Sequence, residues 1–310
     1  MTVLVTGGTG WIGSNVVRTL VDRGQQVVTF DSTRGAWRLQ GVPNVQMVRG
    51  DILDFPALFE TIQRFKVTHI VHLAAVLKGE SQKNPRLLQK VNCEGTVNVL
   101  EAARLAGVSR LVFGSSTVAY GLTQYEPVDE DHPTSPVDMY GASKVFGEVM
   151  LRDYNKLYGM DFAALRFPHV YGPGREKGTA VWKDLFEYPA RGQHYILPSG
   201  GDHELNWVYV KDCGTAAAAA CLVDKLEERF FNICEGVRHT PKEIAEMISK
   251  EIAPGATFEI GPGLVPGHPA EHTMDISRAE RVLGWKPDFS MYQGCKDYLD
   301  TLRSSTQGQR

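Results

Sequence analysis

Near the start of the chain, residues 3–13 read Val3-Leu4-Val5-Thr6-Gly7-Gly8-Thr9-Gly10-Trp11-Ile12-Gly13, and a helix-like run follows to Leu20. A β-branched run, a glycine turn and an amphipathic segment predict a strand, a loop and a helix. The glycines have the spacing Gly-x-x-Gly-x-x-Gly, and Gly8, Gly10 and Gly13 also satisfy the dinucleotide fingerprint Gly-x-Gly-x-x-Gly. Such glycines allow a tight turn and let the backbone approach a pyrophosphate, which the N–H groups of the helix start can bind.

An ordinary strand-to-helix turn could carry the same glycines, so two further features matter. The motif ends the first predicted strand, and a second hydrophobic run, residues 27–30, ends in Asp31, eighteen residues after Gly13. An acid about 20 residues beyond the glycines binds the adenosine ribose hydroxyls in dinucleotide sites. No Gly-Lys-Ser/Thr follows, which excludes a P-loop. The sequence therefore predicts a dinucleotide site.

The composition bounds the class of protein. The chain has 310 residues, 43% of them hydrophobic and 22% charged, which is typical of a soluble globular protein with one or two domains. A net charge of −3 gives no electrostatic signal for nucleic acid or an anionic membrane, and no run of 18 apolar residues occurs. No signal peptide is readable, and five scattered cysteines without C-x-x-C fit a reducing compartment. We expect a cytoplasmic protein without nucleic-acid or membrane partners.

The histidines offer one candidate metal site. His268, Glu271 and His272 are their only close cluster, and they lie in a Pro/Gly-rich stretch without the H-E-x-x-H pattern. A plain polar loop explains this cluster better than a metal site does. We predict no metal.

Strands and helices are expected to alternate regularly over the first half of the chain. The predicted strands are 3–6, 27–30, 45–48, 67–73, 110–113 and 162–167, and the predicted helices include 56–65, 85–106 and 139–157. This alternation indicates an α/β fold with a doubly wound parallel sheet of the Rossmann kind. From Pro168 onward Pro and Gly interrupt every run, which predicts a smaller, loop-rich C-terminal substrate region.

We therefore divide the chain into two regions. Residues 1–170 are expected to form the dinucleotide-binding domain, and residues 203–235 return to it. The substrate-binding region is expected at 171–202 and 236–303, with further helices at 241–252, 278–283 and 292–303. Residues 304–310 are polar and read as a frayed tail.

Three side chains form a candidate catalytic group. Tyr140 and Lys144 stand four apart in a predicted helix and share one face, and Ser116 follows the strand at 110–113, where ligands bind. A phenol has a pKa of about 10, so a base working near neutrality needs about 4 kcal/mol of added preference for the phenolate. The neighbouring lysine and an oxidised nicotinamide could supply it. Alone, Tyr-x-x-x-Lys occurs on many solvated helices, but here it follows a dinucleotide motif.

At this point the chain resembles the extended short-chain dehydrogenase/reductase family, which includes nucleotide-sugar epimerases and dehydratases. The resemblance runs from Thr2 to about Asp300. It is carried by Gly7-x-x-Gly10-x-x-Gly13, Asp31, Gly50-Asp51-Ile52, His72-Leu73-Ala74-Ala75, Asn92-x-x-Gly95-Thr96, Ser115-Ser116, Tyr120-Gly121, Tyr140-x-x-x-Lys144, Leu165-Arg166-x-x-x-Val170-Tyr171-Gly172-Pro173, Val208-Tyr209-Val210-x-Asp212, Asn232-Ile233 and Leu283-Gly284-Trp285-x-Pro287.

The resemblance implies roles for these residues. Tyr140 would take the proton of a secondary alcohol while hydride passes to the nicotinamide, Lys144 would lower the tyrosine pKa and hold the ribose, and Ser116 would bind the reacting oxygen. Cofactor contacts are implied at Gly7, Gly10, Trp11, Ile12, Gly13, Asp31, Asp51, Ile52, Leu73, Ala74, Ala75, Tyr140, Lys144 and Pro168, and substrate contacts at Ser116, Thr117, His169 and Arg175. Asp31 favours NAD over NADP, because it would repel a 2′-phosphate, although Arg34 and Arg38 lie nearby in the sequence.

Departures from the family pattern bear on the substrate. Thr117-Val118 stand where dehydratases have Asp-Glu, so dehydration is not expected. His169 replaces a common Asn, Leu205 or Asn206 a common Arg, and residues 265–268 a common Arg-Pro-Gly-Asp. Those arginines clamp a diphosphate, and each lost charge-assisted hydrogen bond costs about 1.5–3 kcal/mol. We hypothesise a smaller substrate: a free sugar, sugar acid, polyol or other hydroxy/keto compound. Arg175, Lys177, Lys183 and Arg238 could still bind an anion.

Three functions remain open at this stage. The first is an NAD-dependent oxidoreductase with net hydride transfer from a secondary alcohol. The alternative is a sugar or nucleotide-sugar epimerase, similar to UDP-galactose 4-epimerase, that retains its NAD. A non-catalytic dinucleotide-binding regulator is disfavoured, because Ser116, Tyr140 and Lys144 are all present.

The family commonly dimerises through the helices at 85–106 and 139–157, so we expect a homodimer, although their apolar faces could also pack within one chain.

Overall fold

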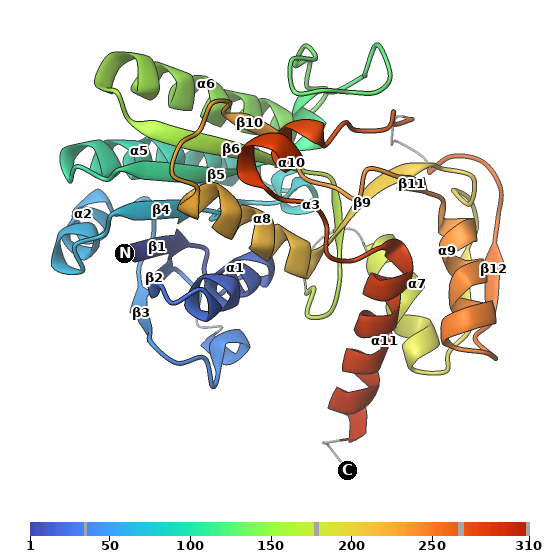
Figure 1. Cartoon of the computed structure of the whole chain (residues 1–310). Helices are drawn as coiled ribbons and strands as arrows, with labels where there is room; N and C mark the ends of the chain where they lie inside the picture. Colours follow the sequence, from blue (N-terminus) through green and yellow to red (C-terminus); the bar gives the residue numbers. More distant parts are fainter. Residues whose placement is uncertain (34–35, 177–179, 266–269, 308–310) are drawn as a thin grey trace.

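A seven-stranded parallel sheet organises the molecule, seen in a computed structural model that describes residues 1–33, 36–176, 180–265 and 270–307 (Figure 1). Its strand order is β10-β6-β5-β4-β1-β2-β3. The bounds are β1 Thr2–Thr6, β2 Gln26–Asp31, β3 Val45–Arg49, β4 His69–His72, β5 Arg110–Ser116, β6 Asp161–Phe167 and β10 Phe230–Asn232. The order reverses between β1 and β4, and ligands of such sheets bind there, at the carboxyl ends of the strands. The predicted α/β fold is confirmed.

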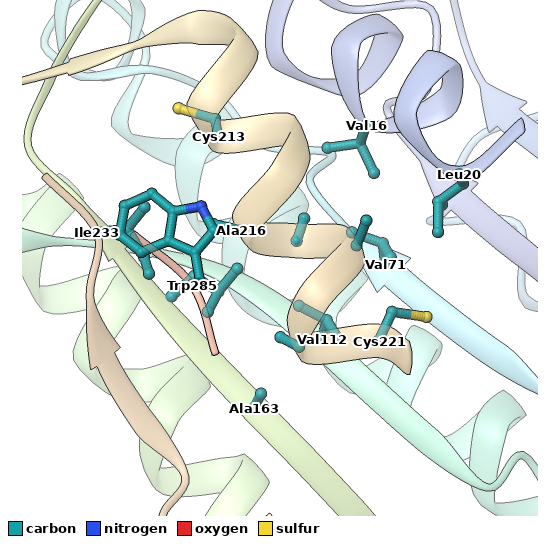
Figure 2. Close-up of a cluster of buried hydrophobic side chains, with 14 of the residues drawn as sticks. Val16, Leu20, Val71, Val112, Ala163, Cys213, Ala216, Cys221, Ile233 and Trp285 are labelled. Carbon is teal, nitrogen blue, oxygen red and sulfur yellow. The ribbon is translucent and has the colours of Figure 1, made fainter. Parts of the chain in front are cut away.

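Helices cover both faces of this sheet. One face carries α1 (Trp11–Asp22), α8 (Val210–Leu222) and α10 (Ser277–Leu283); the other carries α2 (Phe55–Arg64), α5 (Gly95–Leu105) and α6 (Met139–Tyr158) (Figure 1). Figure 2 shows the first face, where α8, with small side chains such as Ala216, lies beside α1 and packs on the sheet. A Cβ on Gly214 would lie 2.8 Å from the Thr19 hydroxyl oxygen. Because Gly214 has no Cβ, α8 can approach α1 closely at this point.

Local sequence signals fix the ends of the helices. Asp138 caps α6 by accepting a hydrogen bond from the Gly141 N–H at 2.8 Å, and the helix ends at Gly159 with φ +69°. Thr240 and Glu243 form a capping box at the start of α9 (Pro241–Met247), which continues as the wider-turn helix η4 (Ile248–Ile252). The helices predicted at 139–157 and 241–252 are confirmed.

The helix predicted at 85–106 differs in detail. It consists of α4 (Pro85–Leu88), a π-helical segment η2 (Gln89–Glu94) and α5, joined without a break. Within η2 the buried Asn92 accepts from the Val76 N–H at 2.7 Å, and it donates to the Val76 carbonyl and the Ser143 hydroxyl, both at 3.1 Å. Single π turns often occur at functional sites. Asn92 fastens the loop after β4 to α6.

The C-terminal part has more regular structure than the expected loop-rich region, although the run Trp207-Val208-Tyr209-Val210 does predict one of its strands. It contains β7 (His169–Tyr171), β9 (Leu205–Tyr209) and β11 (Arg238–His239) in one sheet and β8 (Tyr195–Leu197) with β12 (Phe258–Ile260) in another, and the helices α7 (Ala180–Ala190) and α11 (Met291–Gln307). Strands of two or three residues are too short to show an alternating pattern. These elements surround their own apolar cluster, which includes Trp207, Phe186 and Tyr298.

Two expectations about the C-terminal half have different outcomes. The frayed tail predicted from residue 304 is wrong over 304–307, because α11 continues to Gln307; residues 308–310 lie outside the described part. Hydroxyl-to-carbonyl bonds such as Ser304 to Asp300, at 2.8 Å, accompany these last turns. The division of the chain into cofactor and substrate regions stays a prediction.

None of the helices within the described ranges is long and apolar enough to cross a membrane.

Candidate active site

One cavity of about 1160 Å³ opens at the carboxyl ends of the central strands. Every residue that the sequence nominated for cofactor or substrate lines it, from Gly7 in the glycine loop to Arg175 beyond β7. The catalytic candidates Ser116, Tyr140 and Lys144 share this cavity with Asp31 at the end of β2. The fold thus brings together residues far apart in sequence, while their roles remain predictions.

The glycine loop is shaped for close approach of a ligand to its backbone. Gly7 has φ +69°, and its carbonyl accepts the Gly10 N–H at 2.9 Å. A Cβ on Gly13 would lie 2.1 Å from that carbonyl oxygen. The N-cap of α1 is Gly10, which has no side chain to cap the helix. The first N–H groups of α1 therefore remain for a ligand, and a pyrophosphate fits this position.

Asp31 lies in the cavity wall and is held by two threonines. One carboxylate oxygen accepts from the Thr9 N–H at 3.1 Å and the Thr9 hydroxyl at 2.7 Å. The other accepts from the Thr33 N–H at 3.0 Å and the Thr33 hydroxyl at 2.9 Å. Sequence reasoning identified Asp31 but not the threonines, because hydroxyl residues in loops carry no distinctive signal. Arg38 also lines the cavity, whereas Arg34 lies outside the described residues.

The catalytic candidates come from β5 and α6. Ser116 ends β5 and donates its hydroxyl to the Phe167 carbonyl at 3.1 Å. Lys144 donates to the Gly114 carbonyl at 2.7 Å and lies 5.5 Å from the centre of the Tyr140 ring. A Cβ on Gly147 would lie 2.5 Å from the Phe113 ring, so this glycine lets α6 pack closely on β5.

The electrostatics of this group differ from the prediction. Burial raises the pKa of Tyr140, and the Asp138 carboxylate raises it further. Burial lowers the pKa of Lys144 to about 8, against an opposing effect of Glu148. In the protein without cofactor the Lys144 ammonium bonds to the Gly114 carbonyl and not to the phenol, so the lowering of the tyrosine pKa by the lysine stays a prediction for the NAD-bound protein. Added positive charge beside Tyr140 is needed for the phenolate to form near neutrality.

A buried ion pair, Arg166 with Glu148, lies close to the catalytic candidates Ser116 and Lys144 along β5 and α6. Arg166 of β6 donates to both carboxylate oxygens of Glu148, at 2.9 and 2.7 Å, and the Ser115 hydroxyl donates to the same carboxylate at 2.7 Å. The two charged side chains are 1% and 3% exposed. This network joins β5, β6 and α6, and its members Ser115 and Glu148 are next to Ser116 on β5 and one helical turn from Lys144 on α6.

The cavity is also lined by a second polar pair. His169 and Glu271 lie 2.9 Å apart, from Nε2 to Oε1, and the other carboxylate oxygen accepts from the Asn206 N–H and amide, both at 2.9 Å. His272 pairs instead with the Thr123 hydroxyl at 3.0 Å, and His268 lies outside the described residues. Across the part of the chain that is described, no three His, Cys, Asp or Glu side chains are grouped to hold a metal.

Arg175 lies beside the dinucleotide loop. Its guanidinium is 5.3 Å from the centre of the Trp11 ring, and it donates to the Val170 carbonyl at 3.2 Å.

Glu271 was not nominated for the substrate, because its partners His169 and Asn206 are far away in sequence. Asn92 belongs to the motif Asn92-x-x-Gly95-Thr96, but no role was predicted for it from the sequence. An amide within an otherwise apolar helix was the feature that could have pointed to it.

Comparison with known proteins gives one consistent result. Residues 3–234 match the family model described as the NAD dependent epimerase/dehydratase family. The chain is 33% identical to a putative UDP-glucose 4-epimerase of Methanocaldococcus jannaschii, over 98% of this chain and 99% of that protein. It is also 33% identical to the UDP-glucose 4-epimerase of Mycolicibacterium smegmatis, over 99% of this chain and 100% of that one.

Solved structures agree. The UDP-glucose 4-epimerase of Thermus thermophilus, solved as a complex with NAD, is 31% identical to this chain, with a TM-score of 0.86. The match covers 98% of this chain and 100% of that one. The UDP-glucose 4-epimerase of Thermotoga maritima, solved with UDP-glucose, is 26% identical, with a TM-score of 0.89. That match covers 99% of this chain and 100% of the other.

Proposed function

The chain belongs to the NAD dependent epimerase/dehydratase family, and we propose that it is an epimerase that inverts a secondary alcohol of a sugar-like substrate with an NAD molecule that it retains. It is an NAD-dependent enzyme of the extended short-chain dehydrogenase/reductase type. The observation that carries the proposal is full-length similarity to epimerases combined with a cavity that holds Ser116, Tyr140 and Lys144. This favours the epimerase alternative over net oxidation, our first interpretation of the sequence.

We assign the following roles to the residues of the cavity. The phenol of Tyr140 takes the proton of the substrate alcohol, and Ser116 donates a hydrogen bond to the reacting oxygen. NAD, when bound, takes and returns a hydride. Between these two hydride transfers the oxidised substrate would rotate and present its other face, and Tyr140 would give the proton back to the oxygen as the hydride returns. Since burial and Asp138 raise the Tyr140 pKa, the positive charge of the oxidised nicotinamide is what favours the phenolate, together with Lys144.

The structure supports retention of the cofactor through a strap, residues 173–176. The Trp11 indole donates to the Pro173 carbonyl at 2.8 Å. Arg38 donates to the Gly174 carbonyl at 3.0 Å and pairs with Glu176 at 2.9 Å. The strap thus joins the start of α1 to η1 (Ala36–Leu39), and both elements line the dinucleotide cavity. We infer that this strap slows the departure of a ligand lying on the glycine loop.

Arg38→Gln is expected to speed NAD dissociation about tenfold, which corresponds to about 1.4 kcal/mol. The change removes the ion pair with Glu176 and weakens the link to Gly174. The measurement is exchange of bound NAD for labelled NAD. Arg49→Gln, at an exposed position on β3, is the control and should leave the rate unchanged. An unchanged rate in Arg38→Gln would show that the strap does not hold the cofactor.

The substrate end supports our proposal of a small sugar-like substrate. The residues at the positions where the family pattern has arginines are buried: Leu205 or Asn206 at the first, and Val265 at the second. Arg238 pairs with Glu204 at 2.7 Å and Glu126 at 3.2 Å, and Lys183 lies 3.7 Å from Glu187. Lys177 lies outside the described residues. The positions expected to clamp a diphosphate therefore offer no guanidinium.

The test of the function uses the purified protein with a panel of free hexoses, uronic acids, polyols and UDP-sugars. We expect bound dinucleotide to be released on denaturation, close to one per chain, and an epimerised product to form without NADH accumulating in solution. Accumulation of NADH without an epimerised product would contradict the proposal in favour of net oxidation. A protein that binds NAD but changes no compound in the panel would instead favour the regulator.

We also propose that the chain is a homodimer joined through α5 and α6, which lie side by side (Figure 1). Apolar side chains remain exposed on these helices, namely Leu105, Phe146, Val149, Leu157 and Tyr158. Val149→Arg is expected to give a monomer, because a charge would be buried unpaired at the interface. Light scattering after size exclusion measures the mass. Leu264→Arg, at an apolar residue exposed elsewhere, should leave the mass as in the wild type, and a dimeric Val149→Arg would place the interface elsewhere.

A further inference from the structure

We propose that the exposed face of the Trp37 indole stacks on the adenine of bound NAD and makes Trp37 a binding residue for the cofactor. The resemblance to the family implies cofactor contacts at Asp51 and Ile52 but none at Trp37. The inference concerns the NAD site and not the reaction, so it applies equally to an epimerase and to an enzyme that carries out net oxidation.

Trp37 is a large aromatic side chain that lines the cavity and yet is exposed. It belongs to η1, and 57% of its surface is exposed. Exposure alone says little, because single apolar side chains are common on protein surfaces. Among the described residues that line this cavity, however, Trp37 is the one exposed aromatic side chain. A planar ligand in the cavity would gain by stacking on such a ring.

Contacts within the protein hold the Trp37 ring in place. The Arg38 guanidinium lies over one face of the indole, with its central carbon 4.3 Å from the ring centre. Arg38 is itself fixed, because it donates to the Gly174 carbonyl at 3.0 Å and pairs with Glu176 at 2.9 Å. Since the ring is already ordered, stacking of a ligand on its other face costs little side-chain entropy.

The surroundings of Trp37 match the adenosine end of the cavity. Trp37 follows Asp31, the predicted ribose ligand, by six residues. The Gly50 N–H donates to the Asp31 carbonyl at 3.0 Å, which joins the ends of β2 and β3 at the cavity. Ile52, just after β3, is 4% exposed and adds an apolar side chain to the lining. A flat base with two π faces suits apolar and aromatic neighbours of this kind.

A second observation points to a ligand beside Trp37. Arg38 also lines the cavity, and its Nε is a buried donor for which the described residues supply no acceptor. A buried N–H group without an acceptor costs free energy, so a ligand that brings an acceptor to it is favoured. Adenosine carries ring nitrogens and ribose oxygens that can accept such a bond. The pair Trp37 and Arg38 therefore offers both a stacking face and a donor.

The experiment measures the binding of two fragments of NAD to the NAD-free, full-length protein by calorimetry. ADP-ribose contains the adenine, whereas nicotinamide mononucleotide does not. Trp37→Leu keeps an apolar side chain but removes the ring, and it should weaken ADP-ribose binding about tenfold, because stacking of a base on an aromatic ring is lost. Binding of the mononucleotide should change by less than about twofold.

Two control variants accompany this change. Trp37→Phe keeps an aromatic face and should bind ADP-ribose within about threefold of the wild type. Tyr292→Leu, at an exposed aromatic residue that is not part of the cavity lining, should leave the binding of both fragments unchanged. Because Trp37 is more than half exposed, neither substitution at this position removes core packing.

Two results would overturn the inference. ADP-ribose binding by Trp37→Leu within about twofold of the wild type would show that the ring does not stack on the base. An equal loss of affinity for both fragments would show that the change loosens the site as a whole and removes no adenine contact. The epimerase proposal fails on other evidence, namely the products formed, so a protein that binds ADP-ribose through Trp37 but inverts no sugar would refute the function and support the inference.

Discussion

Tyr140→Phe is expected to lower turnover by about 10³-fold while NAD remains bound, since loss of a positioned acid–base group costs about 10²–10⁴ in rate. The phenylalanine ring fills the same space and removes only the hydroxyl that takes and returns the substrate proton. Lys144 keeps its bond to the Gly114 carbonyl, so the cavity should keep its shape. Turnover is measured as epimerised product over time, and NAD content by release on denaturation.

The matched control is Tyr158→Phe, on the same helix but 53% exposed. It should keep wild-type turnover. If Tyr140→Phe retained more than about a tenth of the activity, another group would have to serve as the base. Loss of bound NAD together with activity would indicate that Tyr140 acts mainly in binding the cofactor.

Glu148→Ala is expected to reduce the free energy of unfolding by about 3–5 kcal/mol, because it leaves the buried Arg166 guanidinium without its partner. Arg166 is 1% exposed and donates to both carboxylate oxygens, so no water can easily replace them. The Ser115 hydroxyl loses its acceptor as well. Urea unfolding of the NAD-free protein, followed by circular dichroism, gives the difference.

Glu246→Ala is the control for this change, because Glu246 forms an exposed pair with Lys250 at 3.0 Å. Its unfolding midpoint should match the wild type, as surface pairs contribute little. A loss of stability in Glu148→Ala no larger than in this control would mean that the ion pair under the active site does not hold β5, β6 and α6 together.

Much of the cofactor end of the site could be predicted because its determinants are local. Glycine spacing, an acid after the second strand and two side chains one helical turn apart are all readable within short segments. Each reflects a backbone requirement, shown by the 2.1 Å between a Cβ on Gly13 and the Gly7 carbonyl oxygen. The carboxyl ends of parallel strands then bring these segments to one cavity.

The cavity wall with His169 and Glu271 could not be predicted in the same way, since its determinants are non-local. His169 and Glu271 are 102 residues apart, and nothing near either one in the sequence indicates the other. The π-helical segment around Asn92 depends on bonds to Val76 and Ser143, on two other segments. The raised pKa of Tyr140 likewise follows from burial and from Asp138. Such features arise only once the chain has folded.

The central claim is that Ser116, Tyr140 and Lys144 converge on the nicotinamide end of bound NAD. A crystal structure of the protein with NAD tests it most directly. We predict the dinucleotide pyrophosphate on the N–H groups of the glycine loop, its adenosine ribose at Asp31, and Lys144 Nζ and Tyr140 Oη within about 3.5 Å of the nicotinamide ribose. A nicotinamide ring outside this cavity, or a Tyr140 hydroxyl turned away from it, would contradict the assignment of all three residues.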